Sequence, residues 1–251
     1  MRLKRIFVAL LAVTALAAVA AGGAQAAAEW KIAGASFTGN KTVSLERHST
    51  VPLTFHSELL GLKVTVTASG ISCATTTGCT ITGGGVSSAG TLKFTGATVD
   101  INEAASPKCA VNGGTVETKP LVDEVIMHPT LKVGETDEEN TKLPVADKFK
   151  PASGTAFATL TFSGAECPLN ETSASVTGTA CGEAVTTEPA GTFKSLSTGQ
   201  EKAVQTLLFG EAQQKTFGCE LKLGTKVAQL TGAVDNKLSE TAELGKVFGV
   251  S

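Results

Sequence analysis

Leu62-Lys63-Val64-Thr65-Val66-Thr67-Ala68 alternates apolar and polar side chains without a break. Successive side chains of a β-strand point to opposite faces, so a strand here would turn all its apolar groups to one side. The same alternation recurs in Ala158-Thr159-Leu160-Thr161-Phe162 and in Cys219-Glu220-Leu221-Lys222-Leu223. Half-buried strands of this kind are typical of antiparallel sheets with one face on a core and the other in water. The sequence therefore predicts an all-β protein.

Short turn signals separate the strand-like runs and favour an antiparallel β-sandwich or flattened barrel. At Gly96 the alternation of apolar and polar residues shifts by one position, so that the other set of side chains would point inward, as at a β-bulge or barrel corner. Helical spacing is weak, and only Leu238 to Val247 fits a turn or two of helix. The turn signals are Gly39-Asn40, Gly83-Gly84-Gly85, Asn112-Gly113-Gly114, Gly182 and Asp235-Asn236.

A Leu-x-Phe pattern occurs four times at unequal spacing. A propeller or solenoid would keep a fixed period, so the pattern is interpreted as strand pairs of one common core. The four copies are Leu53-Thr54-Phe55, Leu92-Lys93-Phe94, Leu160-Thr161-Phe162 and Leu207-Leu208-Phe209.

The first 26 residues have the pattern of a secretion signal. Arg2, Lys4 and Arg5 precede an apolar run, and Ala24-Gln25-Ala26 is a small-x-small cleavage site. Cleavage there would leave residues 27–251 as a secreted protein, extracellular or at the cell envelope, with no transmembrane segment. Such a chain folds where thiols oxidise.

The charge of that mature chain argues against several partners. It would carry 18 basic and 23 acidic residues, because three of the 21 basic residues lie in the leader. Only one arginine, Arg47, would remain, and the chain has no tyrosine and one tryptophan. Nucleic acids and anionic membranes select basic surfaces, so both are excluded as expected partners. Sugar-binding platforms rely on exposed aromatic residues and are disfavoured as well.

Six cysteines follow the expected cleavage site, and an even number in an exported chain predicts three structural disulfides. Cys73 and Cys79 flank a candidate hairpin loop and are expected to face each other. Cys167 and Cys181 enclose a second short segment with turn residues and are a second candidate pair, although sequence alone does not choose among the 15 possible connectivities. No Cys-x-x-Cys pair occurs, so a zinc site has little support. The six are Cys73, Cys79, Cys109, Cys167, Cys181 and Cys219.

One acidic segment is the candidate for an internal boundary in the chain. The segment 134–148 holds a cluster of carboxylates and is predicted to be a solvated acidic loop. We expect a single all-β domain over 27–251, with this loop as the candidate internal boundary between two smaller β units. The acidic residues lack the spacing of an EF-hand, so calcium binding by this loop is not predicted.

Catalytic and cofactor motifs are missing from the sequence. His48, His56 and His128 are the three histidines, and no Gly-x-Ser-x-Gly elbow, His-Glu-x-x-His or phosphate-binding glycine motif accompanies them. We expect no enzyme activity, no cofactor and no metal; a hydrolase built on one of these histidines is the weak exception.

Three segments resemble a group of secreted, threonine-rich actinobacterial proteins of unknown function. The resemblance lies in Gly114-Thr115-Val116-Glu117-Thr118-Lys119-Pro120-Leu121, in Pro151-Ala152-Ser153-Gly154-Thr155-Ala156-Phe157-Ala158 and in Val176-Thr177-Gly178. It differs after Leu121, where Val122-Asp123-Glu124-Val125 replaces a glycine-rich continuation. The resemblance implies export and one all-β fold, and it supplies neither a catalytic residue nor a ligand.

Two functional classes fit these features. The first is a non-enzymatic structural or partner-binding protein of the envelope or extracellular space, which binds an unknown partner through strand edges and loops. The alternative is an extracellular carrier that holds a small apolar ligand inside a β-barrel. A packed interior is the usual case, so the first class is preferred on sequence alone.

Overall fold

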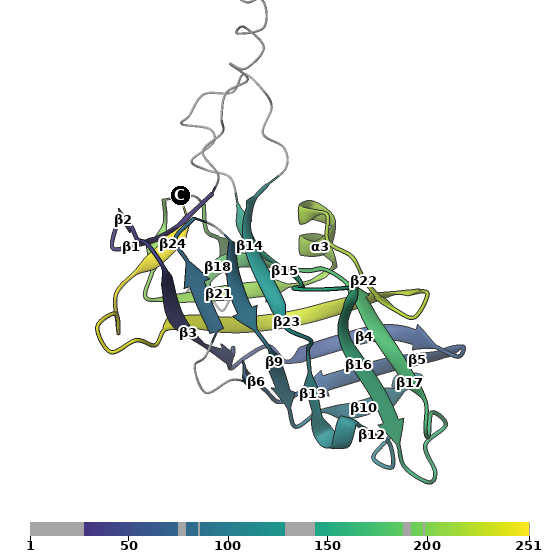
Figure 1. Ribbon diagram of the computed structural model, residues 1–251. Coiled ribbons are helices and arrows are strands. Elements are labelled where there is room, and N and C mark those ends of the chain that lie inside the picture. Colours follow the sequence, from purple (N-terminus) through teal and green to yellow (C-terminus); the bar gives the residue numbers. More distant parts are fainter. Residues whose placement is uncertain are drawn as a thin grey trace, which may run out of the picture.

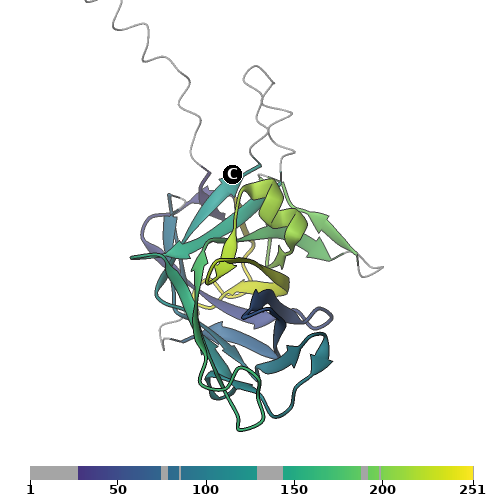
Figure 2. The same ribbon diagram turned by 90° about the vertical axis from the view of Figure 1, so that its right-hand side faces the viewer.

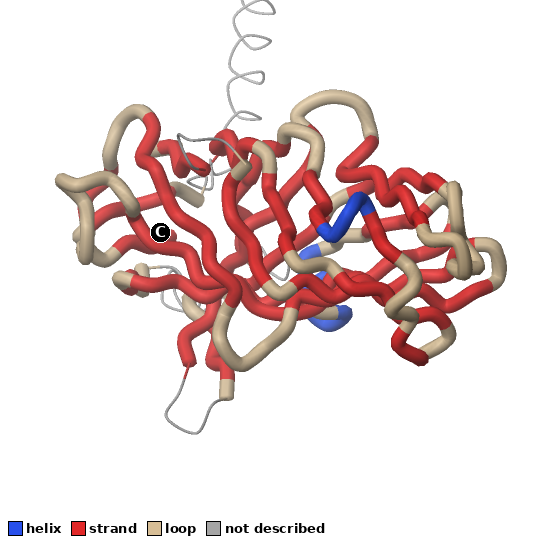
Figure 3. The backbone as a smooth tube through the Cα atoms, turned by 90° about the horizontal axis from the view of Figure 1, so that it is seen from below, coloured by secondary structure: helices blue, strands red, loops and turns tan. Residues whose placement is uncertain are grey.

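The computed structural model describes residues 28–74, 79–84, 86–128, 144–187, 192–197 and 199–250. Within these ranges the chain is almost entirely antiparallel β-structure, which confirms the all-β, sandwich-like fold class (Figures 1 and 3). The expected signal peptide, residues 1–26, lies outside the described residues.

The strands range from two to 13 residues in length. They are β1 (Trp30–Ile32), β2 (Ala35–Ser36), β3 (Asn40–Arg47), β4 (Leu53–Leu59), β5 (Leu62–Ala68), β6 (Gly70–Cys73), β7 (Cys79–Thr82), β8 (Val86–Gly90), β9 (Leu92–Thr95), β10 (Thr98–Ile101), β11 (Ala104–Ala105), β12 (Ala110–Val111), β13 (Thr115–Glu117), β14 (Leu121–Met127), β15 (Val145–Pro151), β16 (Ala156–Ser163), β17 (Ser173–Gly178), β18 (Ala180–Thr187), β19 (Phe193–Ser195), β20 (Glu201–Lys202), β21 (Val204–Phe209), β22 (Leu221–Leu223), β23 (Lys226–Leu238) and β24 (Phe248–Val250).

Helical structure is confined to two short segments of the described chain. A 3-10 turn, η1 (Asn112–Gly114), coincides with a predicted turn, and the α-helix α3 spans Glu211–Phe217. The helix expected between Leu238 and Val247 is wrong, because Leu238 ends β23 and turns follow it. The helix α3 ends at Gly218, whose left-handed backbone (φ 67°) suits a glycine.

Eight strands form a first ring near the C-terminal end of the molecule (Figure 1). Their order is β8, β14, β15, β18, β21, β23, β3 and β7. The ring closes where β7 lies beside β8, and there the Thr82 N–H donates to Ser87 Oγ at 2.6 Å. A small sheet of β2, β1, β24 and β20 packs against this ring, with Trp30 and Phe248 fully buried.

A second ring occupies the opposite end of the molecule. Its order is β11, β10, β5, β4, β23, β22, β17, β16 and β12, and β12 returns beside β10 and β11. The three-stranded sheet of β6, β9 and β13 forms a further wall. Gly96 separates β9 of that wall from β10 of the ring, so the predicted corner is a real change of sheet.

The 13-residue strand β23 belongs to both rings. Its first part pairs with β22 and β4, and its second part pairs with β21 and β3. The change occurs at Gly232, whose φ of +126° is unfavourable for other residues. A Cβ there would collide with the Pro52 carbonyl oxygen and lie 2.9 Å from the Leu53 Cα. Glycine is therefore required where the two rings meet.

At the level of Gly232, three neighbouring segments of the chain leave the sheet and then rejoin it; we call each such segment an excursion. Opposite the two residues 232–233, the neighbouring chain has six residues, 48–53, of which 48–52 connect β3 to β4. Between β21 and β22 the excursion contains α3. Between β15 and β16 it comprises the bend 152–155. We call this level, where strands pass from one ring to the other, the waist.

One hydrophobic core runs through both rings, and all four Leu-x-Phe copies contribute to it. Phe162, for example, is fully buried, whereas Phe55 and Phe94 are half-buried against the same cluster. The interpretation of Leu-x-Phe as a common core pattern is confirmed. Alternation in β5 also has the predicted sense, because Val64, Val66 and Ala68 are buried.

Two of the predicted turns are wrong. Gly182 lies inside β18, and Asp235-Asn236 lies inside β23. At Gly182 a Cβ would lie 2.7 Å from the Phe209 Cζ, so this glycine serves close packing across the first ring. The glycine at position 182 therefore reflects close side-chain packing and not a turn.

The cysteines form the three predicted disulfides, and the six residues leave no free thiol. Cys73 pairs with Cys79, as expected from their flanking positions. The second expected pair is wrong: Cys109 pairs with Cys167, and Cys181 pairs with Cys219.

The reason is that Cys181 faces outward from β18. There it forms a small cluster with Cys219 and with Phe217, the last residue of α3. Figure 2 shows α3 on the outside of the strands. Cys167 instead lies beyond β16 and is joined to the start of β12 in the second ring.

The acidic loop expected at 134–148 falls mostly outside the described residues. Its last part is not a loop, since Val145 already begins β15. The question of one or two folding units stays a prediction.

Candidate functional site

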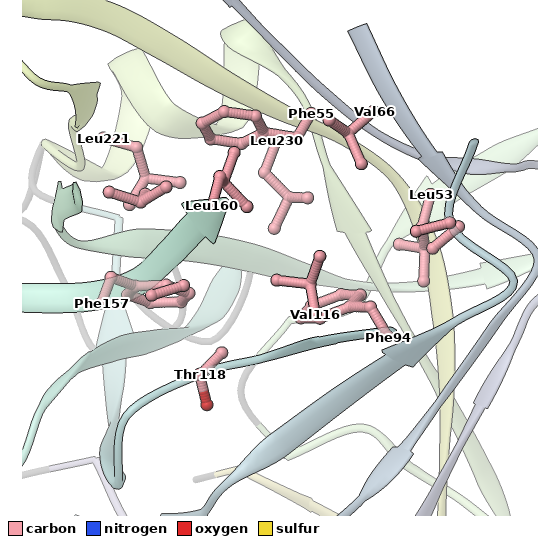
Figure 4. A pocket seen from close by; sticks show the side chains of 14 residues that line it. Leu53, Phe55, Val66, Phe94, Val116, Thr118, Phe157, Leu160, Leu221 and Leu230 are labelled. Atoms are coloured by element: carbon pink, nitrogen blue, oxygen red, sulfur yellow. The ribbon is translucent and has the colours of Figure 1, made fainter. Parts of the chain in front are cut away.

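An apolar cavity lies inside the second ring (Figure 4). Strands β4 and β5 supply one wall, β16 and β17 the opposite wall, and β9 and β13 a third. The volume is about 60 Å³. The lining residues are Leu53, Phe55, Val66, Ala68, Phe94, Ala97, Val116, Thr118, Phe157, Ala158, Leu160, Val176, Leu221 and Leu230.

Alternation explains why these side chains converge. On β5, Val66 and Ala68 point inward while the threonines between them point outward, and on β16 Ala158 and Leu160 do the same. Strands from several parts of the chain thus turn their apolar faces to one space. No single segment contains the site.

Thr118 is the one lining side chain with a polar group, and that group is already used. Its Oγ1 accepts a hydrogen bond from the Leu92 N–H at 2.9 Å. Apart from this hydroxyl, the cavity offers no polar side-chain group to a ligand. Polar solutes lose their hydrogen bonds to water without replacement in such a space, so only apolar groups gain by entering it.

A second cavity of about 20 Å³ adjoins the first. The two share the walls Leu53, Phe94, Phe157 and Leu230. A rotation of one shared phenylalanine side chain would connect them. An apolar cavity of roughly 150 Å³ takes up benzene or xenon, so the present space suits a few carbon atoms or the end of an alkyl chain.

Phe55, Phe94 and Ala97 form the partly exposed part of the lining. The other cavity walls are almost fully buried, as at Leu53 and Leu221. Because these three side chains lie nearest the surface, small movements of them would open the cavity to solvent.

The histidines do not come together. His48 Nδ1 lies 2.9 Å from Asp235 Oδ1, which also accepts a hydrogen bond from Thr206 Oγ1 at 2.8 Å. His56 Nδ1 lies 3.0 Å from Thr65 Oγ1 on the surface of the second ring. His128 contacts Phe217 edge-on, with ring centroids 6.0 Å apart.

His48 and Asp235 form the most enzyme-like pair in the described part of the chain. In a Ser-His-Asp site, the histidine would also hold a nucleophile. Here the hydroxyl in the cluster, that of Thr206, is bonded to the carboxylate and not to the histidine. The pair is explained as a polar link between neighbouring strands β3, β21 and β23 on the outer face of the first ring.

The described residues contain no group of three or more His, Cys, Asp or Glu side chains placed to hold a metal ion. None of their helices has the length and hydropathy needed to cross a bilayer.

The sequence analysis gave an interior apolar cavity only as the alternative and named none of its lining residues, although a signal for them exists. Three of the four Leu-x-Phe copies contribute lining residues, including Leu53, Phe94 and Leu160. The pattern marks apolar strand pairs. It does not distinguish a filled core from a cavity, because both have the same composition.

Comparisons with known proteins give no relative. No family model matches the chain, and neither a curated protein nor a solved structure is significantly similar to it. The resemblance to secreted actinobacterial proteins stays an expectation that rests on the three sequence segments.

Proposed function

We propose that this chain is an exported, non-enzymatic β protein that holds a small apolar molecule, or the end of an alkyl chain, in the cavity of the second ring. The sequence analysis gives this carrier function as the alternative. The observation that carries it to first place is a cavity of about 60 Å³ in which the only polar side chain, Thr118, already has its hydrogen bond.

The ligand class follows from the walls. Aliphatic and aromatic side chains surround the space, and no charged residue lines it. Each methylene group transferred from water to such a site gains about 0.8 kcal/mol. A chain of four or five carbons would gain about 3 to 4 kcal/mol, so we expect weak binding with a dissociation constant no tighter than about 1 mM.

Export is supported by the amino-terminal pattern and by the cysteines. All six are disulfide-bonded, two of the bridges joining residues 38 and 58 positions apart in sequence. Long-range bridges of this kind persist in oxidising compartments. A location outside the cytoplasm, in the medium or at the envelope, is therefore part of the proposal.

Partner binding through strand edges is the second candidate. The observation in its favour is β19, which pairs only with β18 in the described residues and leaves its other edge open. This edge is short, from Phe193 to Ser195. Short edges are a common protection against strand addition, so the cavity gives the better-supported function.

Two measurements test the carrier function. A native mass spectrum of the protein from its host's medium would detect a natural ligand as an extra mass lost on denaturation. Methyl NMR with added n-pentane or benzene would test the empty site directly. We expect shifts for the methyl groups of Leu53, Val66 and Leu230, and no shifts for methyl groups of the first ring such as Val125.

A matched pair of variants locates the binding. Ala158→Leu fills the cavity from β16 and should abolish the response to pentane, whereas Ala104→Leu on the exposed strand β11 should leave it unchanged. Should Ala158→Leu fail to fold, Ala68→Val provides a smaller filling. Absence of both a natural ligand and any pentane or benzene response would reject the carrier function and return strand-edge binding to first place.

A further inference from the structure

The first ring contains two carboxylates in its interior. Asp123 on β14 and Asp147 on β15 lie on neighbouring antiparallel strands, because Asp123 pairs with Phe149 and Val125 pairs with Asp147. The two residues are thus diagonal neighbours on the same face of the sheet. They line one cavity of about 10 Å³, the size of a single water molecule or ion.

Both carboxylates are removed from solvent. Asp123 is 4% exposed and Asp147 is 3% exposed, among apolar neighbours that include Val43, Ile81 and Phe149. Burial raises the pKa of Asp123 to about 7. Burial, followed by repulsion from Asp123, raises the pKa of Asp147 well above its ordinary value. The uncompensated charge is costly in this position.

No basic side chain in the described part of the chain pairs with these carboxylates. Two basic residues of β3, Lys41 and Arg47, lie on the same face of the strand as the inward-facing Val43. Arg47 Nε donates to the Ser69 carbonyl at 2.8 Å, and Lys41 Nζ lies 2.9 Å from Glu243 Oε1. The basic side chains of β3 therefore bind other groups and do not neutralise Asp123 or Asp147.

A third oxygen completes the cluster. Asn236, on β23, is 3% exposed and lines the same cavity. Its Oδ1 has no hydrogen-bond partner in the described structure, and neither has Asp123 Oδ1. Native proteins leave few buried polar atoms without a partner, so two of them beside one cavity indicate a missing occupant.

From this arrangement we propose that the cavity between Asp123, Asp147 and Asn236 is a structural calcium site. Two bidentate carboxylates and one amide would provide five hard oxygen ligands, and Ca²⁺ takes six to eight, so one to three backbone oxygens would complete the shell. A divalent cation balances the two negative charges. Mg²⁺ retains several of its own waters, for which a cavity of about 10 Å³ has no room.

The site is independent of the proposed ligand cavity, because its residues belong to the first ring. It also differs from the acidic loop, which lacks the spacing of a calcium site. The ion would cross-link β14, β15 and β23 from inside, so binding should appear as a gain of stability.

The test uses the full-length mature protein, unfolded without reductant and refolded in either EGTA or 1 mM CaCl₂, because a buried site exchanges slowly. We expect calcium to raise the melting temperature by at least about 5 °C, and 1 mM MgCl₂ to have no comparable effect. A native mass spectrum should show one bound calcium ion that replaces two protons.

Asp123→Asn should abolish the calcium response and, in EGTA, melt at or above the temperature of the unaltered protein, because one buried charge is gone. The matched control is Glu124→Gln, on the outward face of β14, whose carboxylate lies 3.0 Å from Lys150 Nζ. It should retain the full response. Asp147→Asn replaces the first variant if that one does not fold. A calcium-refolded protein with no bound ion and an unchanged melting temperature would overturn the site.

Discussion

The two rings share strand β23, but an apolar cavity lies inside the second ring and buried polar side chains lie inside the first. The same face of β23 presents Ala228 and Leu230 to the second ring and Val234 and Asn236 to the first, all four being buried. In the second ring Leu230 borders an apolar cavity, and in the first Asn236 lines a small cavity together with two carboxylates. Alternation therefore decides which side chains point inward. The other strands decide whether the interior is apolar or polar.

The largest expected effect is at the waist, where the two rings share β23. Gly232→Ala introduces a Cβ into the Pro52 carbonyl at a backbone φ of +126°. We expect the free energy of unfolding to fall by at least about 4 kcal/mol, with both rings affected, since strain and collision act together. Denaturant unfolding measures the loss.

Gly224→Ala is the matched control, because Gly224 also has a positive φ (+60°) but its Cβ would meet nothing within 4 Å. Its cost should be about 1 kcal/mol. Equal costs for the two variants would show that the waist is not a special constraint.

Removal of the Cys181–Cys219 bridge separates the outer layer of the first ring from its strands. The double variant Cys181→Ser, Cys219→Ser should lose about 3 to 4 kcal/mol of unfolding free energy in the loop-entropy model. Hydrogen exchange should increase first in α3, which the bridge holds against β18. Faster exchange in β5 of the second ring instead would contradict this assignment.

The buried carboxylates should make the first ring sensitive to pH. The pKa of Asp123 is raised from 3.8 to about 7, so the folded state keeps a proton that the unfolded state releases near pH 4. Without calcium, the contribution of Asp123 to stability is therefore most favourable below about pH 4 and falls by up to about 4 kcal/mol as the pH rises to 7.

Chemical denaturation in EGTA at several pH values measures this decline, which Asp123→Asn should make smaller. Stability that rises over the same interval would mean that the carboxylate is ionised and paired in the folded protein.

The smallest expected effect concerns the second ring. Val176→Ile adds one methylene group to the wall of the apolar cavity. We expect a stabilisation of about 0.5 to 1 kcal/mol with no change in the pH dependence. Thermal unfolding at two pH values tests both parts, and a destabilised variant would indicate that the cavity wall is rigid.

The sequence was sufficient for the fold class and for part of the covalent framework. Strict alternation at Leu62–Ala68 required a strand, and the flanking positions of Cys73 and Cys79 indicated their bridge. These features depend on neighbours along the chain. The partners of Cys167 and Cys181 depend on which strands adjoin in space, so spacing alone gave the wrong pair.

The interior sites were beyond sequence analysis for the same reason. Asp123 stands between inward-facing Leu121 and Val125, and the pattern shows a charge on an apolar face without showing its cause. Only the register of β14 with β15 brings Asp147 beside it. The apolar cavity likewise requires the packing of six or more strands.

The three excursions at the waist have a consequence for how this protein can change. Between β3 and β4, between β15 and β16, and around α3, the chain already leaves and rejoins the sheet without disturbing the register on either side. Additional residues at these points would extend into solvent while both interiors stay intact. The waist is thus a natural place for lineages to acquire new surface loops, and for engineers to graft foreign peptides.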